Sequence, residues 1–321
     1  MTTERKNDLL ARFRLAEKRF DLAGEWRSTI PRNLTRLLWL RERFLLYVLV
    51  RLGLGSFLPK TLQAKTLWGR EFVLPSSDLY AVSLYCFRAL TGDDVRLAKF
   101  LIKNLRGGDV FYDIGANYGY YSMLAQEIIG DGEIHLFEPV PELAGYLRKN
   151  FVAGRHGRAF INGKAVSDCV GAASFYESFS KNMSGISTLL PFVANANADS
   201  FRKVTVSTIS LDEYLKTHRA PTMLKIDVEG AEEKVLSGAA RALAGKPIII
   251  MEVWYPPLEN SGHVRAIELL LRNGYDAHSI EKDGSLSPDA RLLEKLKGSD
   301  ARMSSGMNDN YAFVHKSETK S

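Results

Sequence analysis

The sequence has only two cysteines, Cys86 and Cys169, which lie far apart in the chain among apolar neighbours. Two such residues supply neither a disulfide framework nor a set of zinc ligands, so we predict that both are buried, reduced thiols. Residues 1–25 are charged throughout and lack the uninterrupted apolar core of a signal peptide. The absence of both features predicts a cytoplasmic location.

Long hydrophobic runs are absent as well. Two short apolar runs within residues 37–50 are separated by charged residues, and neither approaches the ~20 residues that a transmembrane helix requires. Arg36, Arg43 and Arg51 fall within roughly 80° of each other on a helical wheel. Residues 36–57 could therefore lie on an anionic membrane surface, which would place the protein peripherally at the inner membrane. The alternative is that the apolar side of this segment packs on the rest of the chain or on a second subunit; the sequence does not reveal the oligomeric state.

Basic residues exceed acidic ones only in the first part of the chain. Residues 1–70 contain 15 Lys and Arg against 6 Asp and Glu, a surplus of nine, whereas the net charge of the whole chain is +6. The remaining residues are therefore slightly acidic, which does not suit nucleic acid. We predict a basic amphipathic helical extension over residues 1–70, one domain over residues 71–316 and a tail over residues 317–321.

Beyond the extension, short β-favouring segments alternate with helical ones, which predicts a mainly parallel sheet with right-handed crossovers and helices on both faces. We expect strands at 110–112, 133–137, 159–166, 204–209, 223–227, 247–251 and 311–314, with a short strand or hairpin at 66–74. We expect helices at 4–27, 79–90, 94–105, 120–129, 141–151, 210–214, from about 228 to 243, and 263–273. The polar stretch 178–200 is the candidate for a mobile substrate loop.

The most informative stretch is the strand, glycine turn and helix of residues 110–122, because open α/β sheets bind nucleotide-like ligands at such a turn. Glu138 ends the next strand 19 residues after Gly119, where a carboxylate accepts hydrogen bonds from ribose hydroxyls. The turn lacks the middle glycine of the dinucleotide fingerprint, so an oxidoreductase is the less favoured interpretation. Asp113, two residues before Gly115, would repel a pyrophosphate but suits a cation. S-adenosylmethionine carries an ammonium and a sulfonium and no phosphate, so the methyl donor is preferred.

Three blocks of sequence, in this order, resemble the FkbM family of S-adenosylmethionine-dependent methyltransferases: Asp113–Gly119, Phe137–Pro139 and Lys225–Glu232. Ala165–Asp168 followed by Gly171, and Ser210–Asp212, are similar to the same family, and the resemblance covers roughly residues 70–316. It implies a class I methyltransferase (Rossmann-like) sheet of seven strands, the last antiparallel. It also implies O-methylation of a hydroxyl on a carbohydrate, glycolipid or secondary metabolite.

By position, the resemblance implies residues for each part of the donor. Glu138 would hold the ribose, and Asp168 would lie near the adenine. The methionine side would be lined by Asp113, Gly115, Ala116, Asn117 and Gly119.

Transfer to a hydroxyl requires alignment of the acceptor and a base or metal that removes its proton. Asp227 is the first candidate for the base and Glu229 the second, since both follow the end of a strand, where α/β sheets bind ligands. The alternative is that Glu229 and Glu232 only favour the first turn of the next helix. Lys225 is expected on the other side of its strand, where it could pair with a carboxylate. A divalent cation held by Asp227, Glu229 and Glu252 is possible in principle but not favoured.

Two other functions remain as alternatives. A nucleic-acid methyltransferase would be expected to carry an Asn-Pro-Pro-Tyr-like motif, and Tyr255-Pro256-Pro257 lacks the leading Asn. A non-catalytic, membrane-associated scaffold with a donor-binding fold is the other. No Gly-x-Ser-x-Gly elbow supports hydrolase chemistry, and His135 in mid-strand is expected to be a core residue. We expect the acceptor to be a small molecule or a glycan.

Overall fold

The computed structural model describes residues 1–25, 49, 52, 59–88, 93–151, 158–178, 189, 201–255, 262–297 and 307–317. The segment 36–57, for which membrane contact is predicted, lies outside the described residues except for Leu49 and Leu52. Most of the predicted substrate loop 178–200 also lies outside them. None of the helices in the described parts is long and apolar enough to cross a membrane.

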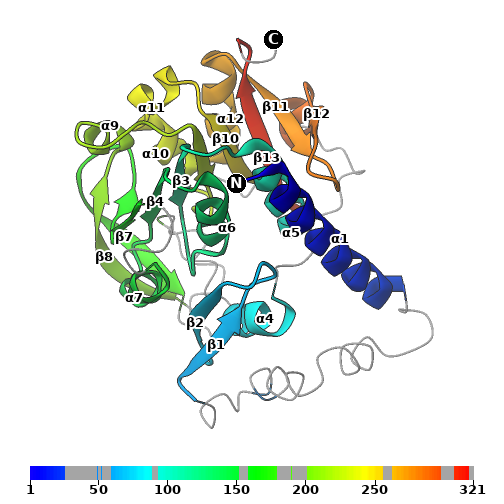
Figure 1. Ribbon diagram of the computed structural model, residues 1–321. Coiled ribbons are helices and arrows are strands. Elements are labelled where there is room, and N and C mark those ends of the chain that lie inside the picture. The colour runs from blue at the N-terminus through cyan, green and yellow to red at the C-terminus, as the bar shows by residue number, and fades with distance from the viewer. Residues whose placement is uncertain are drawn as a thin grey trace.

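A central sheet organises the fold (Figure 1). Its spatial order is β12 (Leu286–Pro288), β11 (Tyr275–Ile280), β13 (Met307–His315), β10 (Ile248–Tyr255), β9 (Met223–Ile226), β3 (Val110–Ile114), β4 (Glu133–Phe137) and β5 (Arg158–Asn162). Strand β13 is antiparallel to both neighbours, and β12 is antiparallel to β11, whereas β10, β9, β3, β4 and β5 pair in parallel. The predicted class I arrangement with an antiparallel last strand is therefore confirmed. The short hairpin strand β12 adds an eighth strand that was not predicted, and β11 was also missed.

Side chains of the central strands alternate between two hydrophobic cores, one on each face of the sheet. Phe111 of β3 belongs to the first core, while Val110, Tyr112 and Ile114 belong to the second. The first core is covered by α5 (Asp93–Asn104), α6 (Tyr120–Ile129) and α7 (Pro141–Asn150). The second is covered by α9 (Leu211–Tyr214), α10 (Glu232–Ser237), α11 (Ala240–Ala244), α12 (His263–Arg272) and α13 (Leu292–Lys297). Because both faces are covered, all five residues of β3 are buried.

Two predicted elements are each divided in the structure. The predicted strand 159–166 becomes β5 and a short strand β6 (Ala165–Val166), separated by the exposed residues Gly163 and Lys164. Strand β6 leaves the central sheet and joins β7 (Gly171–Ser178) and β8 (Phe201–Ile209) in a three-stranded sheet. The predicted helix ending near residue 243 is interrupted at Gly238, where a Cβ atom would lie 2.4 Å from the carbonyl oxygen of Ser167.

The beginning of the chain packs on the domain. Helix α1 (Thr3–Glu25) lies along α5, with Leu9 and Phe13 buried in the first core (Figure 1). The buried Lys99 of α5 donates a hydrogen bond to Glu17 of α1 over 2.5 Å. Strands β1 (Thr61–Lys65) and β2 (Glu71–Pro75) then form a hairpin that leads into α4 (Leu79–Phe87). The predicted domain boundary at residue 70 falls in the turn of this hairpin, and the division itself stays a prediction.

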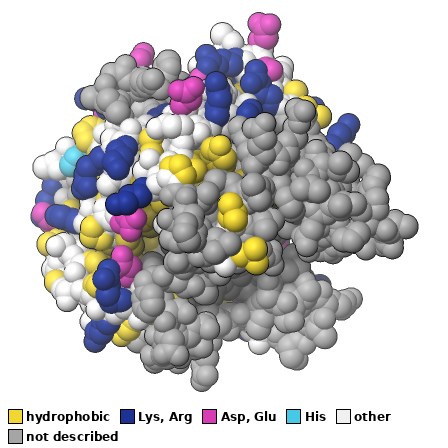
Figure 2. Space-filling model, turned by 90° about the horizontal axis from the view of Figure 1, so that it is seen from below, with side chains coloured by type: hydrophobic (Ala, Val, Ile, Leu, Met, Phe, Trp, Pro, Cys, Tyr) yellow, Lys and Arg dark blue, Asp and Glu magenta, His cyan; other side chains and the backbone are white. Residues whose placement is uncertain are grey.

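The surface and the thiols bear on two predictions. On the face seen in Figure 2, basic side chains of the described residues lie beside acidic ones at several places. The thiol of Cys86 is buried, as predicted. The prediction for Cys169 is wrong, because that thiol is exposed together with its neighbours Asp168 and Val170, in a turn between two strands.

Candidate active site

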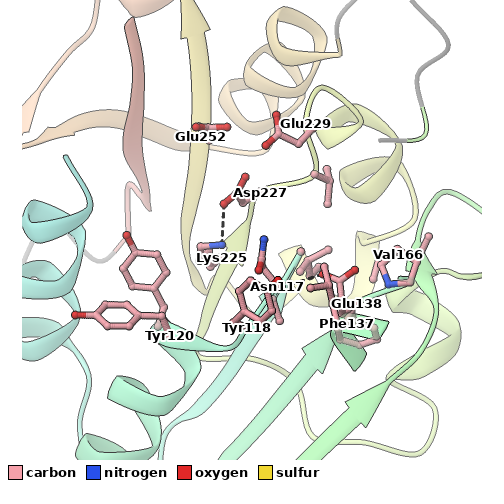
Figure 3. Close-up of a pocket in the computed structure, with 18 of the residues that line it drawn as sticks. Asn117, Tyr118, Tyr120, Phe137, Glu138, Val166, Lys225, Asp227, Glu229 and Glu252 are labelled. Carbon is pink, nitrogen blue, oxygen red and sulfur yellow. Dashed lines mark hydrogen bonds and ion pairs between the residues drawn. The ribbon is translucent and has the colours of Figure 1, made fainter. Parts of the chain in front are cut away.

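A cavity of about 250 Å³ lies where β3, β4 and β9 end, far larger than the roughly 30 Å³ that one water occupies in the liquid (Figure 3). The carboxyl ends of parallel strands are where open α/β sheets bind ligands. The polar and charged side chains of its lining are Asn117, Glu138, Lys164, Lys225, Asp227, Glu229 and Glu252. The remaining lining is mainly aromatic and aliphatic.

The glycine turn is shaped by contact with the protein itself. Gly115 has φ +79°, and a Cβ atom there would lie 1.8 Å from the carbonyl oxygen of Asp227. Gly119 has φ +80°, and its Cβ would lie 2.7 Å from the Phe151 ring. Both positions therefore require glycine for backbone conformation and for packing. Gly115, Ala116 and Asn117 line the cavity, whereas Gly119 is outside the lining and begins α6.

Glu138 lies beside this turn and contacts its backbone. It is buried, and its two oxygens accept hydrogen bonds from the backbone N–H groups of Asn117 and Val140, each over 3.0 Å. Burial raises the pKa of Glu138 to about 7, although the two backbone hydrogen bonds act against that rise. The carboxyl group is thus held rigidly at the cavity wall (Figure 3).

Asp113 does not line the cavity. Its carboxylate is buried, accepts a hydrogen bond from the Ser122 hydroxyl over 2.6 Å and lies 3.3 Å from the Lys225 ammonium. Burial raises the pKa of Asp113, while Lys225 and the Ser122 hydroxyl oppose the rise. The charge of Asp113 is therefore compensated inside the protein. This corrects the expectation that Asp113 offers its charge directly to a cationic ligand.

Lys225 lies on the same side of its strand as Asp227, so its predicted orientation is wrong. Residues i and i+2 of a strand point to one face, and the Lys225 ammonium lies 3.1 Å from the Asp227 carboxylate (Figure 3). Burial acts to lower the pKa of Lys225, but Asp113 and Asp227 outweigh it and raise the pKa. A charged lysine therefore joins the glycine turn to the acidic residues.

Three carboxylates converge at the other end of the cavity. Asp227, Glu229 and Glu252 each bring one oxygen to a place where all three oxygens lie within 4.8 Å of one another (Figure 3). Burial, followed by the charges of Glu252 and Asp227, raises the pKa of Glu229 well above its ordinary value. Such a cluster suits either a shared proton or a hard divalent cation. Glu252 lies within β10 rather than after it, because the strand continues to Tyr255.

Three other residues considered in the sequence lie outside the cavity lining. Asp168 is exposed and accepts a hydrogen bond from the Ser167 hydroxyl, so the structure does not bring it to the donor side. Glu232 is fully buried in the first turn of α10. His135 is fully buried, hydrogen-bonded to the Tyr214 hydroxyl, and burial lowers its pKa to about 4, which confirms its assignment to the core.

One wall of the cavity was not predicted. Tyr80 and Leu84 come from α4, Phe175 comes from β7, and Tyr118 and Tyr120 flank the second glycine of the turn. The tyrosines around Gly119 form a cluster in the sequence, so their part of the wall could have been predicted. The contribution of α4 could not have been predicted, because it depends on how the β1–β2 hairpin places that helix.

Known proteins resemble part of this chain. Over 174 residues it is 26% identical to the hexuronic acid methyltransferase AglP of Haloferax volcanii, which covers 53% of this chain and 66% of that protein. It is 27% identical to the 31-O-demethyl-FK506 methyltransferase FkbM of Streptomyces tacrolimicus, over 43% of this chain and 62% of that protein. The chain thus spans just under two thirds of the length of each relative.

A solved structure of a S-adenosylmethionine-dependent O-methyltransferase from Thermotoga maritima aligns with 79% of this chain and 77% of its own, at 12% identity and a TM-score of 0.39. The family comparison is stronger: residues 113–277, just over half of the 321 residues, match the Methyltransferase FkbM domain. The matched range holds the glycine turn, Glu138 and all three clustered carboxylates. The chain belongs to the FkbM methyltransferase family.

Proposed function

We propose that the protein is an S-adenosylmethionine-dependent O-methyltransferase that acts on a hydroxyl of a carbohydrate, glycolipid or secondary metabolite. One observation carries the proposal: a single cavity holds both the glycine turn with Glu138 and the three-carboxylate cluster. Family membership supports the reaction class. The names of the two relatives support the acceptor class, since one is a hexuronic acid methyltransferase and the other acts on 31-O-demethyl-FK506.

On the donor side, the proposal assigns direct contact to Gly115, Ala116, Asn117 and Glu138, which line one end of the cavity. Glu138 accepts hydrogen bonds from the ribose hydroxyls, which its position beside the turn allows. Asp113 and Gly119 act indirectly, Asp113 by holding Lys225 and Gly119 by shaping the turn and the start of α6. Near the adenine, Ala165 and Val166 form the wall in place of Asp168.

On the acceptor side, the hydroxyl oxygen attacks the methyl carbon in line with the sulfonium. The carbon–sulfur bond breaks, an ether and S-adenosylhomocysteine form, and the hydroxyl proton moves to a carboxylate. Glu229 is the preferred proton acceptor, because a base works best when its pKa lies near the operating pH and that of Glu229 is raised. Asp227, paired with the Lys225 ammonium, instead orients the site. On the sequence alone, Asp227 is the first candidate for the base and Glu229 the second, and this proposal reverses that order.

A divalent cation at Asp227, Glu229 and Glu252 remains the less favoured alternative. The oxygens of these three residues are close enough to bind one ion. If bound, it would polarise the acceptor hydroxyl and lower its pKa. Turnover after dialysis against a chelator, with and without added Mg²⁺, separates this alternative from a carboxylate base acting alone.

Binding and turnover together test the proposal. We expect calorimetry to show binding of S-adenosylhomocysteine by the wild type and none by Glu138→Ala. Glu229→Gln should keep that affinity within about threefold while methyl transfer to a panel of sugars and polyols falls by roughly 10²-fold or more. Glu213→Gln is the matched control, because Glu213 is an exposed carboxylate of α9 that pairs with Lys216, and this variant should behave as the wild type. Tight NADH binding without S-adenosylhomocysteine binding would overturn the proposal, and so would full turnover in Glu229→Gln.

We also propose that residues 36–57 make peripheral contact with an anionic membrane, on the basis of their three aligned arginines. Deleting residues 1–60 is an unsuitable test, because Leu9 and Phe13 of α1 are part of the core. A better variant replaces Arg36, Arg43 and Arg51 by Gln. We expect the wild type to float with phosphatidylglycerol vesicles and this variant not to. Equal flotation of both proteins contradicts the proposed membrane contact.

A further inference from the structure

The loop that carries the acidic cluster has an unfavourable backbone. It joins β9 to α10, and its Glu229 and Gly230 both have positive φ, at +56° and +100°. Glycine adopts this conformation readily, whereas a residue with a Cβ atom, such as Glu229, does so only where its surroundings impose it. Something must therefore hold Glu229 in place.

Glu232 is positioned to hold the loop from the side of α10. One of its carboxylate oxygens, Oε1, accepts the backbone N–H of Gly230 over 3.1 Å and that of Val228 over 3.4 Å. These are the two amides on either side of Glu229. The side chain of Glu232 is fully buried and lies outside the cavity lining, so it acts on the backbone and not on a ligand.

The start of α12 contacts both Glu232 and the same loop. His263, also fully buried, brings its Nδ1 to 3.2 Å from the second oxygen of Glu232. The preceding residue, Gly262, donates its backbone N–H to the carbonyl oxygen of Gly230 over 2.9 Å. A Cβ atom at Gly262 would lie 2.8 Å from that same oxygen, so the two backbones are in close contact.

We propose that Glu232, supported by His263, is a positioning residue that holds Glu229 in its left-handed conformation and so keeps the Glu229 carboxylate beside Asp227 and Glu252. Without the acceptor oxygen of Glu232, the two flanking amides lose their partner, and residue 229 relaxes toward a right-handed conformation. Its carboxylate then leaves the cluster, although the cluster's residues are unchanged. The inference rests on the proposed function, since it gives Glu229 a part in methyl transfer.

Two substitutions at one position separate hydrogen-bond acceptance from charge. Glu232→Gln keeps a side-chain oxygen for the two amides, whereas Glu232→Ala removes it. The probe is the sugar or polyol of the panel that the wild type methylates fastest. With it, we expect Glu232→Ala to lower kcat at least about 30-fold while its KM for the probe stays within threefold of the wild type. Glu232→Gln should keep kcat within about fivefold. Glu233→Ala is the matched control, because Glu233 lies in the same helical turn but pairs with the exposed Arg265; it should behave as the wild type. Wild-type kcat in Glu232→Ala overturns the proposal, and so does an equal loss in Glu232→Gln.

Amide hydrogen exchange gives a readout that does not depend on activity or on the folding of Glu232→Ala. In the folded His263→Gln variant, we expect the peptide that contains residues 226–232 to exchange at least about tenfold faster than in the wild type, while peptides of β3 and β4 stay unchanged. Unchanged exchange of residues 226–232 overturns the proposal. If the wild type transfers no methyl group to any acceptor but the exchange result holds, the proposed function fails while the positioning of the loop stands.

Discussion

Replacing Gly115 by alanine would disturb the contact between the glycine turn and the loop after β9. The new Cβ atom would lie 1.8 Å from the carbonyl oxygen of Asp227 and 2.9 Å from its carbonyl carbon. Both are backbone atoms, so no side-chain rotation relieves the overlap. The residue would also keep φ +79°, which alanine disfavours. The turn and the acidic loop must therefore move apart.

The expected loss of stability in Gly115→Ala has two components. The left-handed conformation costs an alanine about 1–2 kcal/mol. Forcing an extra methyl group into a packed site costs typically about 1–3 kcal/mol more. We expect the free energy of unfolding of Gly115→Ala, measured by equilibrium urea denaturation, to fall by about 2–5 kcal/mol. Affinity for S-adenosylhomocysteine, measured by calorimetry, should fall at least tenfold because Gly115 lines the cavity.

Two control variants separate the components. Gly108 has φ +82°, and nothing lies within 4 Å of its Cβ position, so Gly108→Ala should show the conformational cost alone. Gly145 lies within α7, again with nothing within 4 Å, so Gly145→Ala should stabilise the protein by about 0.5–1 kcal/mol. Gly115→Ala could instead unfold at the same urea concentration as Gly108→Ala and bind S-adenosylhomocysteine like the wild type. That result would refute the steric cost that we assign to the contact with the Asp227 backbone.

The pKa of Glu138, about 7 in the folded protein against an ordinary 4.5, predicts that its contribution to stability is complete below pH 4.5 and is lost as the pH rises through about 7. This group alone should lower the free energy of unfolding by about 3 kcal/mol across that pH range. Glu138→Gln should show a smaller fall when the free energy is measured by urea denaturation at each pH. If the variant and the wild type show the same fall, the raised pKa is contradicted. Lys225→Met removes the cation that lies 3.3 Å from Asp113 and 3.1 Å from Asp227, so it should cost about 3 kcal/mol in the same assay. Lys234→Met, at an exposed position, is the control, and equal stability of the two variants would refute the buried ion pair.

Local chemistry explains which elements were predictable from the sequence. Strand Glu133–Phe137 and helix Tyr120–Ile129 have the predicted bounds, because apolar residues between glycine turns specify both ends. Strand β11, Tyr275–Ile280, was missed because Asp276 and His278 interrupt its apolar pattern. It forms because it can pair with β13, a partner far along the chain.

The same distinction applies to the site. The sequence by itself determined the family, the glycine turn and the carboxylates Glu138, Asp227 and Glu229, since these follow strands whose ends meet at one edge of a parallel sheet. It also indicated Glu252, although this residue lies within β10 and not after it. Only the tertiary structure decided that Lys225 neutralises Asp113 and that α4 forms a wall of the cavity. It also decided that Asp168 stays at the surface. Motifs record the conformation of a few neighbouring residues, whereas distances between side chains depend on how separate elements pack.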